Sequence, residues 1–221
     1  PLVGFVLIPS GSFMMGHDTE ARKDARGKTM NHNPSRPVLV ESAFYIARTL
    51  TTVDQFAQFL EDKDYFDAVH DDKARGGTKG AKTAEANWRI PERWIEQRPY
   101  GNRPVAEVTW FQARAYARWL DARLRSEKDS VFKSLPSGYE VRLPNEKQWE
   151  RAARATGMGE ADFHTDRWPY GATEETLKDF ANVDGTGIER VSSVGVFPPT
   201  AIGLADIVGN AWQWMDNEYL T

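Results

Sequence analysis

Cysteine is absent from all 221 residues of the chain. Its absence excludes disulfide frameworks, thiolate nucleophiles and thiolate-ligated zinc, copper or iron–sulfur sites from these residues. Small domains in oxidising compartments usually carry disulfides, so the composition favours the cytoplasm. Secretion after removal of a signal peptide is the alternative that the sequence leaves open.

Two further features are missing: a long apolar run and a large excess of one charge. No stretch of about 18 uncharged apolar residues occurs, so we expect no transmembrane helix. With 28 basic and 32 acidic residues the net charge is −4, which argues against nucleic acids and membrane surfaces as partners. Hydrophobic residues make up 40% of the chain, enough for one globular domain that buries about 70% of its unfolded surface.

Three amphipathic helices are the clearest regular elements in the sequence. Each apolar pattern follows a Ser/Thr/Asn-type cap that has a partner residue three positions further on, the signature of a capping box. The expected boxes are Thr51 with Asp54, Thr109 with Gln112, and Asn145 with Gln148. The last helix is expected to bury Trp149, Ala152 and Ala153.

Extended structure is expected near the start of the chain and irregular structure near its end. Residues 5–8 and 12–15 flank a Pro-Ser-Gly turn in a hairpin-like pattern, and apolar residues within 38–46 predict a further extended stretch. After Gly157 there is little periodicity but many glycines, prolines and aromatics. Such a region needs partners other than regular ladders for its backbone polar groups.

Five sequence blocks, read in order, carry a resemblance to a known family. They are IPSGSFMMG (8–16), NRPV and VTW (102–110), VRLPNE and WE (141–150), WPYG (168–171) and GLADIVGNAWQW (203–214). Over nearly its whole length the chain resembles the formylglycine-generating-enzyme/sulfatase-modifying-factor family. The resemblance implies an α+β, C-type-lectin-like fold with little regular structure, in a single domain (1–221) that lacks the family's C-terminal segment.

The resemblance also implies a calcium ion at the last block. The ligands in the family are a side-chain oxygen, two backbone carbonyls and a carboxylate, which fall here on Asp206, Gly209, Ala211 and Gln213. Calcium accepts carbonyl and amide oxygens alongside carboxylates. Gln213 stands where the family commonly has glutamate, so we expect a weaker site. A structural turn capped by Asp206 is the alternative.

A second calcium site in the family begins at positions that match Asn182 and the carbonyl of Val183. Its downstream carboxylate falls near Thr186, which leaves Asp184 as the substitute. The alternative for Asn182 is an Asx-turn. Trp212 and Trp214, which adjoin the first site, are expected in the core because large aromatics mostly contribute buried area.

The redox chemistry of the family is not expected from these residues. Its namesake reaction oxidises a substrate cysteine with a copper ion held by two enzyme cysteines, and this chain has neither thiol. A second branch uses histidines from a separate helical domain, whereas the four histidines here are scattered without a metal-ligand spacing. We therefore assign no catalytic residue and expect no copper.

Family members also serve as binding modules, some fused to signalling domains and others variable proteins of bacterial diversity-generating retroelements. The segment with Trp88, Arg93, Trp94 and Tyr100 resembles multidomain bacterial members, and these residue types are enriched in binding hot spots. Packing at the core edge is the alternative. We expect a calcium-supported recognition domain for a protein or small ligand. The alternative is the N-terminal portion of a copper-dependent formylglycine-generating oxidase whose cysteines lie elsewhere.

Overall fold

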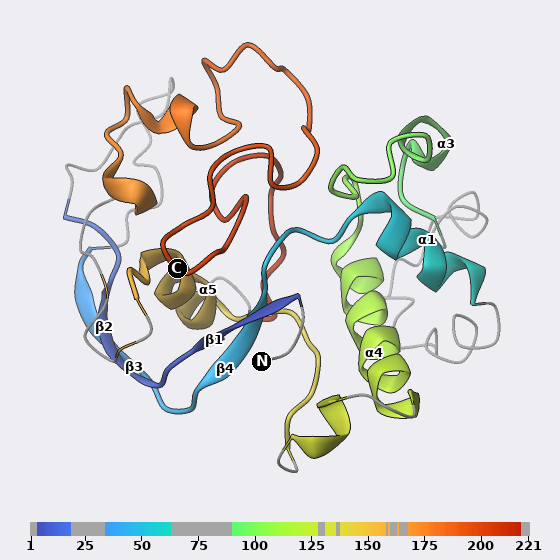
Figure 1. The fold of residues 1–221 in the computed structure, drawn as a ribbon, viewed down its shortest axis with the longest axis horizontal. Helices are drawn as coiled ribbons and strands as arrows, with labels where there is room; N and C mark the ends of the chain where they lie inside the picture. The colour runs from blue at the N-terminus through green and yellow to red at the C-terminus, as the bar shows by residue number, and fades with distance from the viewer. Residues whose placement is uncertain are drawn as a thin grey trace, which may run out of the picture.

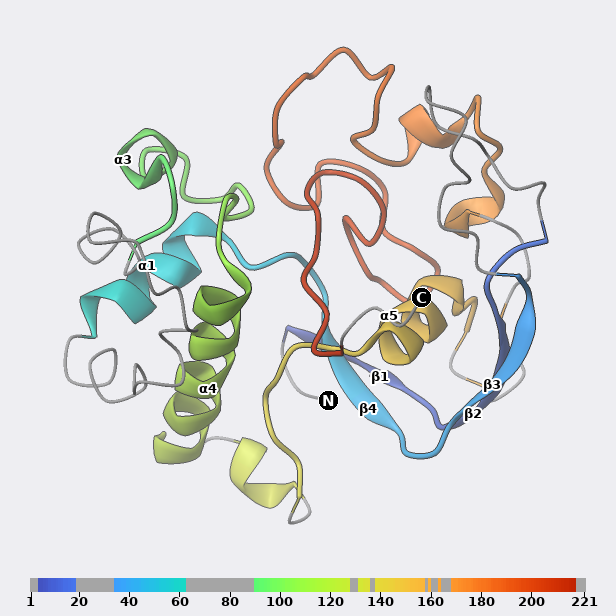
Figure 2. The same ribbon diagram turned by 180° about the vertical axis from the view of Figure 1, so that it is seen from behind.

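The helices and strands gather in two groups, joined by a long irregular tail (Figures 1 and 2). The computed structural model describes residues 4–18, 34–62, 90–127, 131–135, 138–157, 159, 163 and 168–217. The helical group consists of α1 (Val53–Glu61), α3 (Trp94–Gln97) and α4 (Trp110–Ser126). The sheet group consists of β1 (Phe5–Ile8), β2 (Gly11–Met15), β3 (Arg36–Val40), β4 (Phe44–Ala47) and α5 (Glu146–Arg154). We call residues 168–217 the tail.

Regular structure is sparse outside these elements. The short 3-10 helices η1 (Val131–Ser134), η2 (Pro169–Gly171) and η3 (Leu177–Asp179) are the remaining elements of the described residues. The tail therefore contains neither an α-helix nor a strand in its described length, as its lack of periodicity predicts. The fold mixes helix and sheet with few regular elements. No helix in the described ranges is long and apolar enough to span a bilayer.

The strands form two separate antiparallel pairs, β1 with β4 and β2 with β3. The hairpin-like pattern predicted over residues 5–15 is wrong, because β1 and β2 follow one another in the chain but pair with different strands. The guanidinium of Arg151 in α5 donates hydrogen bonds to the carbonyl oxygens of Pro9 and Ser10 at 2.8 Å and of Ser12 at 3.2 Å. Arg151 thus supplies the hydrogen bonds that a facing strand would otherwise give to carbonyls where β1 leads into β2.

Capping boxes begin all three predicted helices, and those of α4 and α5 are the predicted pairs. The box predicted for α1 from Thr51 and Asp54 is wrong by one residue, since Thr52 caps the helix together with Gln55. The carbonyl oxygen of Thr51 instead accepts a hydrogen bond from the Val105 amide at 3.0 Å. This bond ties the start of α1 to the segment before α4.

Each group has its own core. In the helical group, Phe56 and Phe59 of α1 pack against Ala115 and Trp119 of α4. In the sheet group, α5 packs against β1 and also against the tail, through Leu204 and Ile207; the core residues it meets in β1 are Val6 and Ile8. The second core therefore joins the two ends of the described chain.

The buried face of α5 contains two arginines that its apolar pattern does not predict. Arg151 is fully buried, and its guanidinium lies 3.9 Å from the ring centroid of Phe163. Arg154 is almost fully buried, donates to the Gly16 carbonyl at 2.6 Å and pairs with Glu150 at 2.8 Å. Buried charges are tolerated when they are paired or fully hydrogen-bonded, and both arginines meet this condition.

Candidate calcium loop and adjoining cavity

The side chain and backbone of Asn210 hydrogen-bond to separate segments of the irregular tail. Its backbone N–H donates to the Asn182 carbonyl at 2.8 Å. Its side-chain Oδ1 accepts from the Ser192 amide at 2.8 Å, and its Nδ2 donates to Asp206 Oδ1 at 3.0 Å. Its φ of +63° is a left-handed conformation that asparagine tolerates better than most residues. Asn210 was not predicted from the sequence, although an asparagine after Gly209 in a region without periodicity is a signal for such a turn.

Asp206 carries a buried charge that the described residues do not pair. Its side chain is only 4% exposed. Its two carboxylate oxygens accept hydrogen bonds from the Gly195 amide at 2.7 Å and from the Asn210 amide group, both neutral donors. No cationic side chain within the described ranges comes within ion-pair distance of it. Buried carboxylates are usually paired with a charge or a metal, whereas the protein donors described for Asp206 are both neutral.

Tyr170 is electrostatically coupled to Asp206. Burial, reinforced by the negative charge of Asp206, raises the pKa of Tyr170 to about 12. Its ring stacks on Phe180 with centroids 5.3 Å apart, and its buried hydroxyl has no hydrogen-bond partner in the part of the chain that the structure describes. The Tyr170 hydroxyl is thus a buried polar atom without a hydrogen-bond partner among the described residues.

Gly209 and Ala211 place their carbonyls in the same turn. A Cβ at Gly209 would lie 2.5 Å from the carbonyl oxygen of Asn182, and its φ is +77°, so a glycine is required there. The Gly209 carbonyl accepts from the Ala211 amide at 2.7 Å. Because a carbonyl oxygen has two lone pairs, this bond leaves the oxygen able to accept a second partner.

Gln213 turns its nitrogen, not its oxygen, toward the loop. Its Oε1 accepts a hydrogen bond from the indole nitrogen of Trp149 at 2.9 Å, while Nε2 lies 3.4 Å from the carbonyl oxygens of Asp206 and Ile207. An indole N–H is only a donor, so the amide oxygen must face it and the orientation is fixed. Carboxylate and carbonyl oxygens, as at Asp206, Gly209 and Ala211, are the kind of ligand that calcium takes, whereas the amide nitrogen that Gln213 turns toward the loop is not.

At the second predicted calcium site, a hydroxyl lies within hydrogen-bond distance of both predicted ligand oxygens. The Oγ1 of Thr186 lies 3.1 Å from Asn182 Oδ1 and 2.9 Å from the carbonyl oxygen of Val183, the two oxygens predicted as ligands. The side chain of Asp184 is exposed. No group of three or more His, Asp or Glu side chains suited to a metal occurs among the described residues, so any cation would need backbone oxygens.

A cavity of about 320 Å³ adjoins the loop and separates it from the helical group. All of β4, one side of α4 and tail residues 204–207 and 211–214 contribute to its walls, most of which are apolar. The expectation that Trp212 and Trp214 lie in the core is wrong, because Trp212 is fully exposed and Trp214 is about half exposed. The indole nitrogen of Trp214 donates to the Val108 carbonyl at 2.9 Å, which anchors the tail beside the start of α4.

The residues predicted to bind a ligand are only partly brought together. Trp88 lies outside the described residues. The ring of Trp94 packs on Phe56 with centroids 6.2 Å apart, whereas Tyr100 is exposed and covered on one face by the guanidinium of Arg103 at 3.9 Å.

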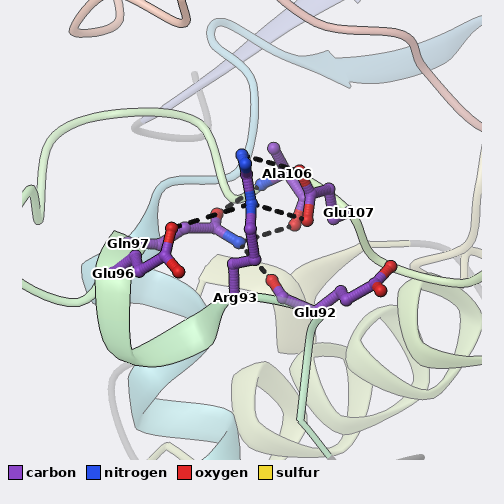
Figure 3. Close-up of polar contacts among 6 residues, drawn as sticks. All are labelled: Glu92, Arg93, Glu96, Gln97, Ala106 and Glu107. Atoms are coloured by element: carbon purple, nitrogen blue, oxygen red, sulfur yellow. Dashed lines mark hydrogen bonds and ion pairs between the residues drawn. The ribbon is translucent and has the colours of Figure 1, made fainter.

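Arg93 is tied into a polar cluster at the start of α3 (Figure 3). Its guanidinium pairs with Glu107 at 2.8 Å and with Glu96 at 3.8 Å, and its backbone is left-handed, with φ of +50°. The amide of Gln97 bonds both the N–H and the carbonyl of Ala106. The cluster fixes the segment after α3, so the paired Arg93 contributes to local structure.

Comparison with known proteins places this geometry in context. The family described as "Sulfatase-modifying factor enzyme 1-like domain" matches residues 1–221. The Bos taurus protein named inactive C-alpha-formylglycine-generating enzyme 2 is 28% identical over 241 residues, covering 98% of this chain and 71% of that protein. The Bos taurus formylglycine-generating enzyme is 28% identical over 237 residues, and the chain spans only 58% of its length.

One solved structure similar to the chain is Treponema denticola variable protein 1. It aligns with a TM-score of 0.54 at 22% identity, over 97% of this chain and 75% of that one. At this identity the likeness concerns the fold, and it agrees with the predicted combination of helix, sheet and irregular chain.

Proposed function

Because the chain belongs to the sulfatase-modifying factor enzyme 1-like family, we propose that it is a recognition domain whose tail is supported by a calcium ion. The observation that carries the proposal is the buried Asp206 carboxylate, which accepts two hydrogen bonds from neutral groups and has no cationic side chain within ion-pair distance in the described ranges. The ligand we propose is a protein or a small molecule.

Asp206 and the carbonyls of Gly209 and Ala211 would hold the ion. When bound, calcium neutralises the buried carboxylate and draws oxygens from one turn together. Asn210 positions Asp206 by its hydrogen bond, and the glycine at 209 allows the turn to approach Asn182. Since Gln213 offers nitrogen to the loop, we propose a site with fewer protein ligands and lower affinity than a glutamate would give.

Recognition, rather than oxidation, is supported by the absence of cysteine from these residues. One relative is named as an inactive enzyme, and a protein of similar fold is named a variable protein. The surface we propose for the ligand lies around α3, where Ile95 and Tyr100 are exposed. Arg93 and Trp94 support that surface through the Glu107 pair and the contact with Phe56.

Thermal unfolding in calcium and in chelator tests the metal part of the proposal. We expect the melting temperature of the unaltered chain to rise with free calcium, because a ligand at 100 times its dissociation constant adds about 2.7 kcal/mol. Asp206→Asn retains an acceptor oxygen but removes the charge, so its melt is expected to ignore calcium. A wild-type melt that is indifferent to calcium would contradict the proposed site.

A matched variant at Gln213 sharpens the test. Gln213→Glu keeps an oxygen for the Trp149 indole and places a second oxygen where the amide nitrogen now faces the loop. We expect this variant to melt at a lower temperature in chelator and to bind calcium more tightly than the wild type. Equal calcium affinity in the two proteins would show that position 213 does not face the ion.

The second candidate is the N-terminal portion of a formylglycine-generating oxidase, favoured by 28% identity to the Bos taurus enzyme and by a chain that spans 58% of it. Copper- and oxygen-dependent aldehyde formation on a cysteine-containing peptide separates the two candidates. We expect no turnover by the 221-residue chain. Turnover above that of a heat-denatured control would replace the recognition proposal with the oxidase.

A further inference from the structure

A turn that begins at Tyr100 and ends at Arg103, which we call the Tyr–Arg turn, is fixed to the start of α1 by its backbone. The Arg103 amide donates to the Tyr100 carbonyl at 2.9 Å and closes the turn. The first amides of a helix have no partner within the helix. In α1, the Val53 amide donates to the Arg103 carbonyl at 2.9 Å and the Asp54 amide to the Gly101 carbonyl at 3.0 Å. The turn is therefore held by bonds that α1 also needs.

Two further contacts hold the Tyr–Arg turn in place. The Asn102 carbonyl accepts a hydrogen bond from the Val194 amide of the tail at 2.9 Å. A Cβ at Gly101 would collide with the Asp54 carboxylate, so only glycine allows this close approach. Because the backbone of the turn is already fixed, a ligand that binds there would lose little free energy to ordering it.

The side chains of the Tyr–Arg turn lie at the surface. Tyr100 is 48% exposed, and the guanidinium carbon of Arg103 lies over its ring, 3.9 Å from the ring centroid. A guanidinium carries its N–H donors in its plane, so contact between its face and a ring leaves those donors able to reach an acceptor. The stacked arginine is therefore oriented to donate hydrogen bonds outward.

Arg103 carries a positive charge that the described residues do not pair. No carboxylate within the described ranges lies at ion-pair distance from its guanidinium. Asp54, whose carboxylate lies against Gly101, pairs instead with Arg98 at 2.9 Å. Arg93, at the start of α3, is also paired. Of these arginines, Arg103 is the one whose charge remains for a ligand.

Apolar surface accompanies this charge. The Tyr100 amide donates to the carbonyl of Gln97, the last residue of α3, at 2.9 Å, so the Tyr–Arg turn follows α3 directly. Ile95 of α3 is 85% exposed, and Ile90, shortly before α3, is 38% exposed. Tyrosine and arginine are enriched in the residues that contribute most to protein binding. The surface therefore combines one unpaired cation with exposed apolar side chains.

We propose that α3 and the Tyr–Arg turn bind a protein segment that presents a carboxylate beside an apolar side chain. This inference rests on the proposed recognition function and names its partner. The carboxylate would accept hydrogen bonds from Arg103, because a planar guanidinium matches the two oxygens of a carboxylate. The apolar side chain would cover Ile95 and the exposed part of the Tyr100 ring.

Other ligand classes fit this surface less well. Small molecules bind in concave sites, whereas Ile95, Tyr100 and Arg103 lie outside the walls of the cavity beside β4. Nucleic acids and anionic membranes present many phosphates and need many cations, which a single unpaired arginine in a chain of net charge −4 does not supply.

Selection from a peptide library tests the proposal. Random dodecapeptides displayed on phage are selected on the immobilised 221-residue chain, and the enriched sequences are synthesised with a fluorescent label for anisotropy measurements. We expect enrichment of Asp or Glu beside Leu, Ile, Phe or Trp. Replacing the acid of a selected peptide by its amide is expected to weaken binding about fivefold, as for a charge-assisted hydrogen bond at a partly exposed site.

Matched arginine variants locate the binding. Arg103→Gln removes the unpaired charge, whereas Arg98→Gln removes an equal charge from an arginine that already has an acidic partner. We expect about fivefold weaker peptide binding for Arg103→Gln and a change of less than about twofold for Arg98→Gln. Arg103→Lys keeps the charge without the planar group, so its affinity should fall between those of Arg103→Gln and the unaltered chain.

Three results would overturn the proposal: no peptide is enriched, the enriched peptides are basic or neutral, or both glutamine variants change the affinity equally. The first two use the unaltered chain, so they decide the question even if a variant does not fold. The calcium melts test the proposed function separately. A chain whose melt ignores calcium and which binds acidic peptides through Arg103 would refute the metal site and keep this inference.

Discussion

The helical group and the tail are stabilised by different interactions. Rings do most of the packing in the helical group, where Phe59 contacts Phe56 at 5.4 Å and Trp119 at 5.7 Å between centroids. The tail has no described strand or α-helix, and its chain segments are joined by the side chains of Asn182, Asp206 and Asn210. Burial of rings is non-directional, whereas each bond in the tail depends on one donor and one acceptor.

This difference determines which residues matter in each region. In the helical group, stability follows the volume of the buried side chain, because truncation leaves a cavity. In the tail it follows hydrogen-bonding capacity, because truncation leaves buried polar groups without partners. Substitutions in the two regions therefore distinguish a loss of packing from a loss of hydrogen bonds.

Phe59→Ala is expected to have the largest effect. Phe59 is fully buried between α1 and α4, and such truncations cost about 3–5 kcal/mol. Urea unfolding followed by tryptophan fluorescence measures the loss. Ile95→Ala, at a side chain that is 85% exposed, is the control and should change the free energy of unfolding by less than about 0.5 kcal/mol.

Asn210→Ala is expected to lower the free energy of unfolding by about 2–3 kcal/mol, since it leaves the Ser192 amide and one carboxylate oxygen of Asp206 without their hydrogen-bond partner. The same urea unfolding experiment applies. Asn210→Gly serves as the comparison, because glycine relaxes the left-handed backbone while still removing the side chain. If both variants are as stable as wild type, the hydrogen-bond account of the tail is wrong.

Helix caps should contribute equally to stability in both groups, because a cap bonds only its own helix. A difference between the groups would therefore reveal interactions beyond the helix end. Thr109→Ala at α4 and Asn145→Ala at α5 each remove a capping box, with an expected loss of about 1 kcal/mol. Thr109→Ser retains the hydroxyl and should recover most of the loss. A much larger loss at Asn145 than at Thr109 would mean that the tail depends on the start of α5.

High pH should weaken both regions through one tyrosine in each. Burial raises the pKa of Tyr116 to about 12 against a lowering hydrogen bond with Thr51, and burial with the Asp206 charge raises that of Tyr170 to about 12. The unfolded tyrosines lose protons near 10, so stability is complete below pH 10 and falls as pH rises toward 12. Tyr116→Phe and Tyr170→Phe should each flatten the fall in denaturant midpoint; an unchanged slope in both would contradict this.

Local signals in the sequence were sufficient for the helices but not for the strand pairing. A capping box needs only residues three positions apart, and α4 and α5 begin where predicted. The connection between β1 and β2 is instead hydrogen-bonded by Arg151, which lies more than 130 positions away in the sequence. Arginine on a helix is normally read as exposed, so the pattern gave no warning.

The hydrogen bonds of the candidate site were not predictable from the sequence. The sequence block predicted Asp206, Gly209 and Ala211 as ligands, and this assignment stays a prediction; in the structure the Asp206 carboxylate is bonded to Asn210 and the Gly209 carbonyl to the Ala211 amide. The role of Asn210 and the orientation of Gln213 arise from partners distant in sequence, Ser192 and Trp149. Trp212 is fully exposed, and the aperiodic block around it gave no local signal for this.

Amide hydrogen exchange with and without calcium tests the central claim most directly, because it reports the tail and the helical group in one experiment. If the buried Asp206 carboxylate holds calcium, saturating calcium will slow exchange at the Gly195 and Asn210 amides and leave α4 unchanged, and Asp206→Asn will abolish the difference. Identical exchange in calcium and in chelator throughout residues 192–213 would contradict the account.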